Sequence, residues 1–306
     1  YNWINVYYFC HMILKECIDI QDDKLTRGIG PVVKIMNLIE GNSDEEIIVD
    51  CSSIKFVSPV FIISFILCLY SSKKRLRVIN KTPYLDIIHF IDTLKPDKLS
   101  KAEFCTLLRK YERKTYIPVI NFPALANRAS DKDAILSAIE NILCLQLGIK
   151  HNVLNGLKYI LGEMVDNITE HSESERGYIF AQSYPKKGYI DLCIADEGIT
   201  LNGSFNKAGI EVENDIEAMQ AANKGVSSKN LPDVENRGYG IYTSKKMLIT
   251  GLKGQYMMMS GSAIYLKAEG FDNIIELPEG LRWNGTIIAL RIPYQNEYFL
   301  YTKYFE

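Results

Sequence analysis

The segment 162–171, GEMVDNITEH, places several side chains that could do chemistry on one side of a predicted helix. At 100° per residue, Asn167 and Glu170 fall within about 40° of Glu163, while the apolar residues of 154–168 gather opposite. A glutamate can take a proton from water or a hydroxyl group, and an asparagine oxygen can bind Mg²⁺ without repelling phosphate. The same pattern also fits a helix face that only meets solvent, so spacing alone leaves both interpretations open.

A further carboxylate, Asp196, follows a predicted strand over 189–195 in which strongly apolar residues alternate with smaller or polar ones. Gly198 comes two positions later, in DEGIT. A carboxylate at a strand end can accept a hydrogen bond from an exocyclic amine, and a glycine lets the backbone approach a flat ring closely. An ordinary turn is the alternative.

Two downstream stretches add anion-binding and ring-binding chemistry. ENRGYGIYTSKKM places Gly238 and Gly240 just before a predicted helix, where backbone N–H groups and the helix dipole favour an anion. NGTIIALRIP predicts a strand in which Thr286 supplies a hydroxyl group near the start. Taken singly, these features are also typical of a helix cap, a hairpin glycine and an edge threonine.

As an ordered set, these four motifs resemble those of the GHKL superfamily of ATP-binding proteins, over about residues 115–295. GEMVDN is similar to its N-box, DEGIT and RGYGI to its two glycine boxes, and NGTIIALRIP to its closing threonine strand. The resemblance implies an α+β two-layer sandwich, an antiparallel sheet with helices on one face and a Bergerat-type ATP site. The short form looks most like the anti-sigma-factor serine kinases.

By this resemblance, Asn167 coordinates Mg²⁺ and Glu163 acts as, or supports, the general base. Asp196 accepts from the adenine amine beside Gly198, and Thr286 helps to hold the adenine. The phosphate-binding residues would then be Arg237, Gly238, Tyr239, Gly240 and Ile241, with the segment 200–237 as a lid. Thr200 stands where the first glycine box usually has its last glycine, which bears on turnover more than on binding. His171 has no assigned role.

The first third of the chain predicts a β-α-β-α order, with strands over 46–50 and 75–79. Ser58-Pro59 is typical of a helix N-cap followed by proline at the first helical position. Residues 20–95 resemble, more weakly, a STAS-type α/β domain, in which a serine near that helix start is phosphorylated. Ser58 as a cap or as a phosphorylation site, with Ser52 and Ser53 as rivals, stays open.

We therefore predict three parts: a STAS-like α/β domain over 1–95, a linker over 96–115 and a GHKL ATP-binding domain over 116–306. The linker is predicted because this segment is highly charged and shows no strong alternation of apolar and polar residues. The second domain should contain helices near 132–147 and 152–171 and antiparallel strands near 116–121, 178–184, 189–195, 255–260, 263–268 and 286–292.

The amino-acid composition and the cysteine pattern indicate which classes of protein and which cellular setting are expected. The 306 residues are 47% hydrophobic and 24% charged, with a formal net charge of −2, which does not favour nucleic-acid binding. Seven scattered cysteines without a C-x-x-C pair favour a reducing, cytoplasmic setting. The longest apolar run, 57–70, is too short to span a bilayer, so we expect no membrane association.

These observations predict a regulatory protein that binds ATP and Mg²⁺ and has kinase-like or ATPase activity. It would signal through a protein partner or substrate, and it could form a homodimer. Two alternatives remain from the sequence: a nucleotide sensor that binds ATP without turnover, and a dimeric ATPase clamp.

Overall fold

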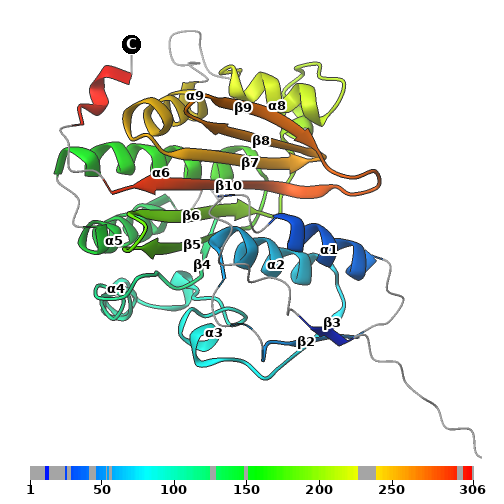
Figure 1. Ribbon diagram of the computed structural model, residues 1–306, viewed down its shortest axis with the longest axis vertical. Helices are drawn as coiled ribbons and strands as arrows, with labels where there is room; N and C mark the ends of the chain where they lie inside the picture. The colour runs from blue at the N-terminus through cyan, green and yellow to red at the C-terminus, as the bar shows by residue number, and fades with distance from the viewer. Residues whose placement is uncertain are drawn as a thin grey trace, which may run out of the picture.

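The computed structural model describes residues 11–13, 25, 29–40, 46–52, 54, 57–124, 129–147, 151–226, 239–294 and 299–304. It is a mixed α/β structure with a seven-stranded antiparallel sheet, in the order β4-β5-β6-β10-β7-β8-β9, and a three-stranded parallel sheet, β1-β2-β3 (Figure 1). The antiparallel sheet confirms the sheet type predicted for the larger part of the chain.

The strands of the large sheet are β4 (Ile120–Pro123), β5 (Arg176–Tyr184), β6 (Tyr189–Asp196), β7 (Gln255–Gly261), β8 (Ala263–Ala268), β9 (Phe271–Glu276) and β10 (Trp283–Pro293). Five predicted strands match β5, β6, β7, β8 and β10 closely, whereas the strand predicted near 116–121 begins later. β9 was not predicted, because most of its residues are exposed and no apolar alternation marks it.

Helices cover one face of this sheet. They are chiefly α5 (Ala129–Leu147), α6 (His151–His171) and α9 (Tyr239–Lys246), which continues into the π-helical segment η4 (Met247–Gly251). One side of α6, including Leu157, Leu161 and Val165, shares a buried cluster with the sheet residues Ile194 and Leu290. The predicted apolar stripe of this helix is therefore confirmed.

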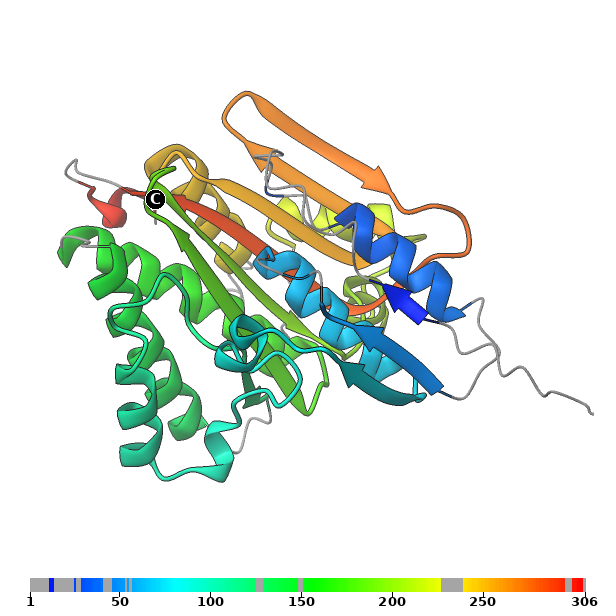
Figure 2. The same cartoon turned by 60° about the horizontal axis from the view of Figure 1, so that its bottom comes forward.

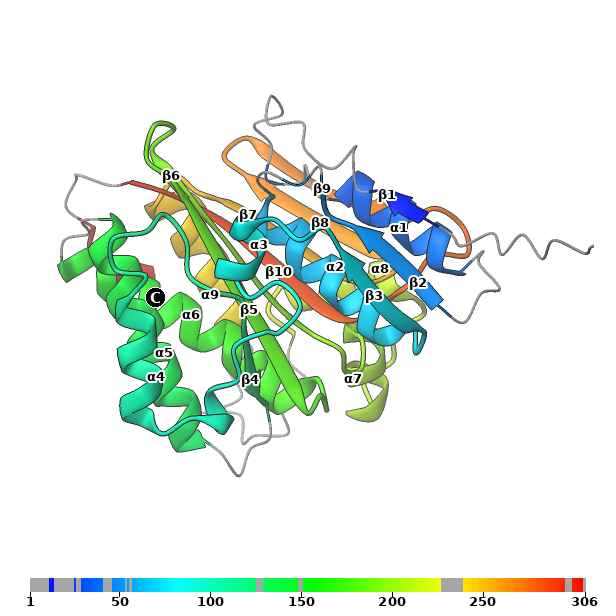
Figure 3. The ribbon, with the colours of Figure 1, turned by 90° about the horizontal axis from the view of Figure 1, so that it is seen from below.

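The opposite face of the sheet is covered by a helix from the first part of the chain, which was predicted to be a separate domain. Helix α2 (Pro59–Ser71) contacts β5, β6 and β10, and Phe61 and Phe65 share a buried cluster with Phe180 and Ala195. Figure 3 shows α2 on one side of the sheet and α5, α6 and α9 on the other. Because β6 is buried along its whole length, the alternation of its residues separates two cores and not a core from solvent.

The first part of the chain has the predicted β-α-β order. Strands β1 (His11–Ile13), β2 (Glu46–Asp50) and β3 (Arg75–Ile79) pair in parallel, and α1 (Ile29–Glu40) and α2 connect them. Figure 2 shows α1 and α2 between this small sheet and the large one. Since both sides of α2 are covered, its apolar character all round has a structural reason.

The N-cap interpretation of Ser58 is confirmed. Its hydroxyl oxygen accepts a hydrogen bond from the Phe61 backbone N–H at 3.3 Å, Pro59 takes the first helical position, and Ser58 is 7% exposed. Ser52 is exposed, and Ser53 lies outside the described residues.

The segment 96–115, predicted as a linker, is folded. It holds a short 3-10 turn, η2 (Pro96–Lys98), and helix α4 (Lys101–Arg109), whose start carries a capping box between Ser100 and Glu103. Phe104 and Leu108 are buried in the same cluster as α5 and α6. The many charged residues on the outer side of α4 made its apolar side hard to recognise in the sequence, which explains why the segment was predicted to be a linker. The helix predicted around 84–93 is also shorter, as α3 (Pro83–Ile87).

The predicted lid segment 200–237 is described as far as residue 226. It contains two helices, α7 (Leu201–Lys207) and α8 (Asp215–Asn223), joined by a small cluster of Phe205, Ala218 and Ala222. A short 3-10 turn, η5 (Tyr301–Tyr304), follows the last strand. Throughout the described ranges, no helix combines the length and the apolar character needed to cross a membrane.

Candidate functional site

The polar side of α6 carries the residue pair predicted to hold a metal ion and a base. Glu163 and Asn167 are partly exposed, on the side away from the buried stripe. The Asn167 side-chain NH₂ group donates to the Glu163 backbone oxygen at 2.7 Å. This bond fixes the Asn167 amide and leaves its oxygen, the atom that can coordinate a cation, out of the contact.

The first turn of α9 lies directly against Glu163. A Cβ atom built on Gly240 would lie 2.0 Å from the Glu163 Oε2 atom, so a larger residue at this position would displace the Glu163 carboxylate from its present place. Burial, and then the Glu163 carboxylate, raise the pKa of the Tyr159 hydroxyl, which lies between Glu163 and Thr243 of α9. The N-box-like and second glycine-box-like motifs therefore meet, although they are far apart in the sequence.

Asp196, at the end of β6, is a buried carboxylate with 1% exposure. The Gly198 N–H donates to its Oδ1 atom at 2.8 Å, and the Thr286 backbone also bonds to it. Burial outweighs these two bonds and raises the pKa of Asp196 to about 7. The carboxylate is thus held by backbone donors in a position where ionisation is costly.

Two glycines enclose this carboxylate. A Cβ on Gly198 would lie 1.8 Å from the backbone oxygen of Ser172, just past the end of α6, which also accepts from the Ile199 N–H at 2.6 Å. A Cβ on Gly285 would lie 2.6 Å from the Asp196 Oδ1 atom, and Gly285 has a φ of +78°. Side chains at either position would push the strand end, the helix end or the carboxylate away.

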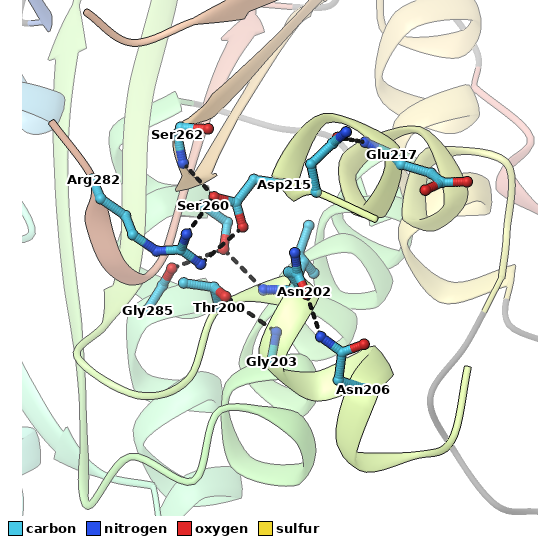
Figure 4. A network of polar contacts seen from close by, with 12 residues as sticks. Thr200, Asn202, Gly203, Asn206, Asp215, Glu217, Ser260, Ser262, Arg282 and Gly285 are labelled. Carbon is cyan, nitrogen blue, oxygen red and sulfur yellow. Dashed lines mark hydrogen bonds and ion pairs between the residues drawn. The ribbon is translucent and has the colours of Figure 1, made fainter. Parts of the chain in front are cut away.

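Thr286, the last motif residue, lies next to Ser260, which belongs to a set of polar contacts between β10, β7 and α7 (Figure 4). Its hydroxyl lies 3.3 Å from that of Ser260, which donates to the Gly285 oxygen at 2.9 Å. The Ser260 hydroxyl also accepts from the Leu201 N–H at 3.0 Å. Thr286 is therefore connected to the start of the predicted lid through one serine.

Thr200, the departure from the glycine-box pattern, has a structural role. It is the N-cap of α7, and its hydroxyl oxygen accepts from the Gly203 N–H at 3.2 Å. A threonine at this position fixes the backbone that follows the first glycine box, where a glycine would leave it free to rotate.

Asp215, which the sequence motifs did not indicate, holds the start of α8 against the sheet. Its carboxylate accepts from the Ser262 N–H at 2.9 Å and pairs with both Arg282 NH groups at 3.0 Å (Figure 4). The sequence did carry a signal for the start of α8, because Asn214 and Glu217 have the spacing of a helix N-cap. In the structure the Asn214 side-chain oxygen accepts from the Glu217 N–H at 2.9 Å. No local pattern could have indicated Arg282, which is 67 residues from Asp215.

The remaining predicted site residues are only partly described. Ile241 packs against the cluster that contains α6. Tyr239 begins α9, but its side chain, like that of His171, lies outside the described residues, as do Arg237 and Gly238. The structure therefore brings together Glu163, Asn167 and Gly240 in one group and Asp196, Gly198 and Thr286 in another, both along α6.

No protein-family model matches the chain, and no curated protein is significantly similar to it in sequence.

Proposed function

We propose that the chain is an Mg-ATP-binding regulatory protein with a Bergerat-type nucleotide site, of the GHKL kind that its motifs resemble. It transfers or hydrolyses the terminal phosphate and signals through a protein partner. In this proposal the first α/β part is a STAS-like region that recognises the partner. Its β-α-β order, with Ser58 at the start of α2, supports that assignment.

The observation that carries the proposal is the contact of both glycine motifs with the same helix. Gly240 adjoins Glu163, and Gly198 adjoins Ser172 at the end of α6. Nine residues of helix separate the two contacts, about 14 Å at 1.5 Å per residue. An extended nucleotide could span this length, with its ring near Asp196 and its phosphates near Gly240.

The donors and acceptors fit such a ligand. Asp196 can accept a hydrogen bond from an exocyclic amine. Because residue 198 is a glycine, its backbone atoms could lie directly beside the nucleotide ring. The first turn of α9 offers backbone N–H groups and a positive helix end to phosphate. The Asn167 oxygen is suited to Mg²⁺, which takes few protein ligands and shares phosphate oxygens; bound there, the ion would neutralise phosphate charge.

Glu163 is the residue placed to handle a proton. Its carboxylate lies beside the first turn of α9, the end expected to hold phosphate. A glutamate there can orient a water molecule or a substrate hydroxyl and accept its proton as the oxygen attacks phosphorus.

Transfer of a labelled terminal phosphate distinguishes the possible reactions. The protein would be incubated with ATP labelled in the γ-phosphate, with Mg²⁺ and with candidate partner proteins. Label on protein indicates a kinase, and free labelled phosphate indicates an ATPase. If no ATP binds at all, the proposed function is wrong.

The metal assignment is tested by Asn167→Ala. We expect affinity for Mg-ATP to fall at least about tenfold, since even residues behind a metal ligand contribute about 10–100-fold to metal affinity. Affinity for ATP in EDTA should change little. Asn155→Ala, an exposed position on the same helix, is the matched control. Unchanged Mg-ATP affinity in Asn167→Ala would remove Asn167 from the site.

The base assignment is tested by Glu163→Gln. This variant keeps the shape of the side chain against Gly240 but cannot accept a proton, so binding should persist while turnover falls about 100-fold or more. Single-turnover kinetics and equilibrium binding would be measured on the same sample. An equal loss of binding and turnover would contradict a base role.

Binding without turnover is a second candidate function, favoured by Thr200. Its hydroxyl fixes the start of α7, at the point where a glycine would allow the predicted lid to hinge. If the labelled-phosphate experiment shows bound ATP and no transfer or release, the protein is a nucleotide sensor.

A further inference from the structure

A cavity of about 370 Å³ lies between α8, α9 and the β8–β9 hairpin, apart from Glu163 and Asp196. Lysines from three elements line it, and we call it the lysine pocket: Lys224 follows α8, Lys245 and Lys246 end α9, and Lys267 lies on β8. One carboxylate in its lining, Asp272, pairs with Lys267. The size is within the range of small-molecule sites, and the charge favours an anion.

Lys245 is the centre of this pocket. Its side chain is 7% exposed, and its ammonium group donates to the Asn223 backbone oxygen at 2.8 Å and to the Asn223 side-chain oxygen at 3.0 Å. The same nitrogen lies 4.9 Å from the centre of the Tyr265 ring. A lysine has three N–H donors, so these two hydrogen bonds leave one for a ligand.

Helix electrostatics explain part of the cluster without a ligand. Lys224 lies at the C-terminus of α8, where positive charge is favourable, whereas Lys245 and Lys246 lie where α9 continues into η4. That reason suffices for Lys224, which is exposed at the surface. It does not explain why the Lys245 ammonium group is buried when its hydrogen-bond acceptors in the described part of the chain are both neutral oxygens of Asn223.

The burial of Lys245 has an electrostatic cost. Removal from water lowers the pKa of Lys245 to about 8, in spite of the opposing effect of Asp272. A buried charge is ordinarily balanced by an opposite charge. A negatively charged ligand in the pocket would supply this balance, with Lys224 and Lys246 adding to the attraction.

We infer that the lysine pocket binds a small phosphate-bearing anion, held by Lys245 between α8 and α9. Phosphate is favoured over a single carboxylate because three lysines besides the paired Lys267 suit a doubly charged group. The exposed Tyr242 ring, also in the lining, offers an apolar surface to the rest of the ligand. This site does not depend on the proposed nucleotide site, which adjoins the first turn of α9 and not the last.

Pyrophosphate is a suitable probe, measured by isothermal titration calorimetry in EDTA without nucleotide. We expect wild-type protein to bind it and Lys245→Met to bind it at least about tenfold more weakly, as expected when a charged hydrogen bond is lost. Lys186→Met, an exposed lysine on the β5–β6 turn, should bind like wild type. Equal affinity in wild type and Lys245→Met would overturn the inference.

A double variant keeps the test decisive. Should Lys245→Met fail to fold, Lys224→Met/Lys246→Met leaves the Asn223 contacts intact and must still weaken binding several-fold; unchanged affinity would overturn the inference. Because Lys224 and Lys246 line the lysine pocket and Glu163 does not, this loss also assigns the probe to the lysine pocket and not to the proposed nucleotide site, whether or not ATP binds.

Discussion

Helices α2 and α6 pack against opposite faces of the same antiparallel sheet, yet they differ in every other respect. α2 is buried from Pro59 to Leu69, with Phe65 stacked between Phe61 and Phe90 at ring distances of 5.5 and 5.6 Å. α6 is buried along one stripe and leaves Glu163 and Asn167 partly exposed on the other. The second helix is the one that meets both glycine motifs.

The difference follows from what covers each helix. The small parallel sheet lies beyond α2, so most side chains of α2 are apolar. The buried Ser64 hydroxyl is an exception, since it has no hydrogen-bond partner among the described residues. α6 has the large sheet on one side and contacts α5, α9, η4 and η5, and within the described ranges these neighbours leave Glu163 and Asn167 partly exposed. A helix that is covered on one side can present polar groups to a ligand, whereas a helix covered on both sides can contribute only stability.

The largest expected effect is the loss of stability on the α2 side. Phe65→Ala removes a fully buried ring, and large-to-small aromatic changes in cores cost about 3–5 kcal/mol. We expect urea denaturation to show this loss, while nucleotide affinity of the folded fraction stays the same. Leu145→Ala, an exposed leucine on α5, should change stability by no more than about 0.5 kcal/mol. Equal losses in both variants would contradict the assignment of α2 to the core.

The same contrast explains what could be predicted from the sequence. In α6 a single covered side produces a clear apolar stripe, so the helix and its polar face were recognised. In α2 the apolar residues surround the helix, and such a pattern does not tell which surface meets the sheet. The position of α2 on the second face, and so the shared core of the two predicted domains, required tertiary contacts.

Among the remaining differences, α4 and Asp215 are instructive. The Ser100–Glu103 capping box was a readable start signal, but charged neighbours outweighed it in the linker prediction. Asp215 and Arg282 form an ion pair, but they are 67 residues apart and belong to different elements, so no local sequence pattern connects them. Motif order identified the candidate site residues, whereas the packing of Gly198 against Ser172 became visible only in the structure.

The next prediction tests whether the proposed nucleotide site beside α6 lowers the free energy of unfolding. Asp196→Asn keeps a side-chain oxygen for the Gly198 N–H but removes the buried charge. A rise in pKa from 3.8 to about 7 corresponds to about 4 kcal/mol, so the variant should be more stable at pH 8 by about 2–4 kcal/mol. Nucleotide binding should weaken, because Asn is a poorer acceptor for an amine.

The pH dependence has a definite sign. Between pH 4 and 7 the folded wild type holds the Asp196 proton more tightly than the unfolded chain does, so its free energy of unfolding falls as pH rises and levels off above about pH 8. Urea titrations at pH 5 and pH 8 should show this slope in wild type and a flatter one in Asp196→Asn. Glu279→Gln, at an exposed turn, should keep the wild-type slope.

The smallest effect concerns the start of α2. Ser58→Ala removes the hydroxyl that caps the helix and should lower the free energy of unfolding by about 1 kcal/mol, while Ser58→Thr keeps a capping oxygen and should lose less. Ser52→Ala, at an exposed position, is the control. Because Ser58 is 7% exposed and its oxygen accepts from Phe61, we expect no phosphate label on it in the folded protein. Label that disappears in Ser58→Ala but not in Ser52→Ala would contradict a purely structural role and would show that the start of α2 can open.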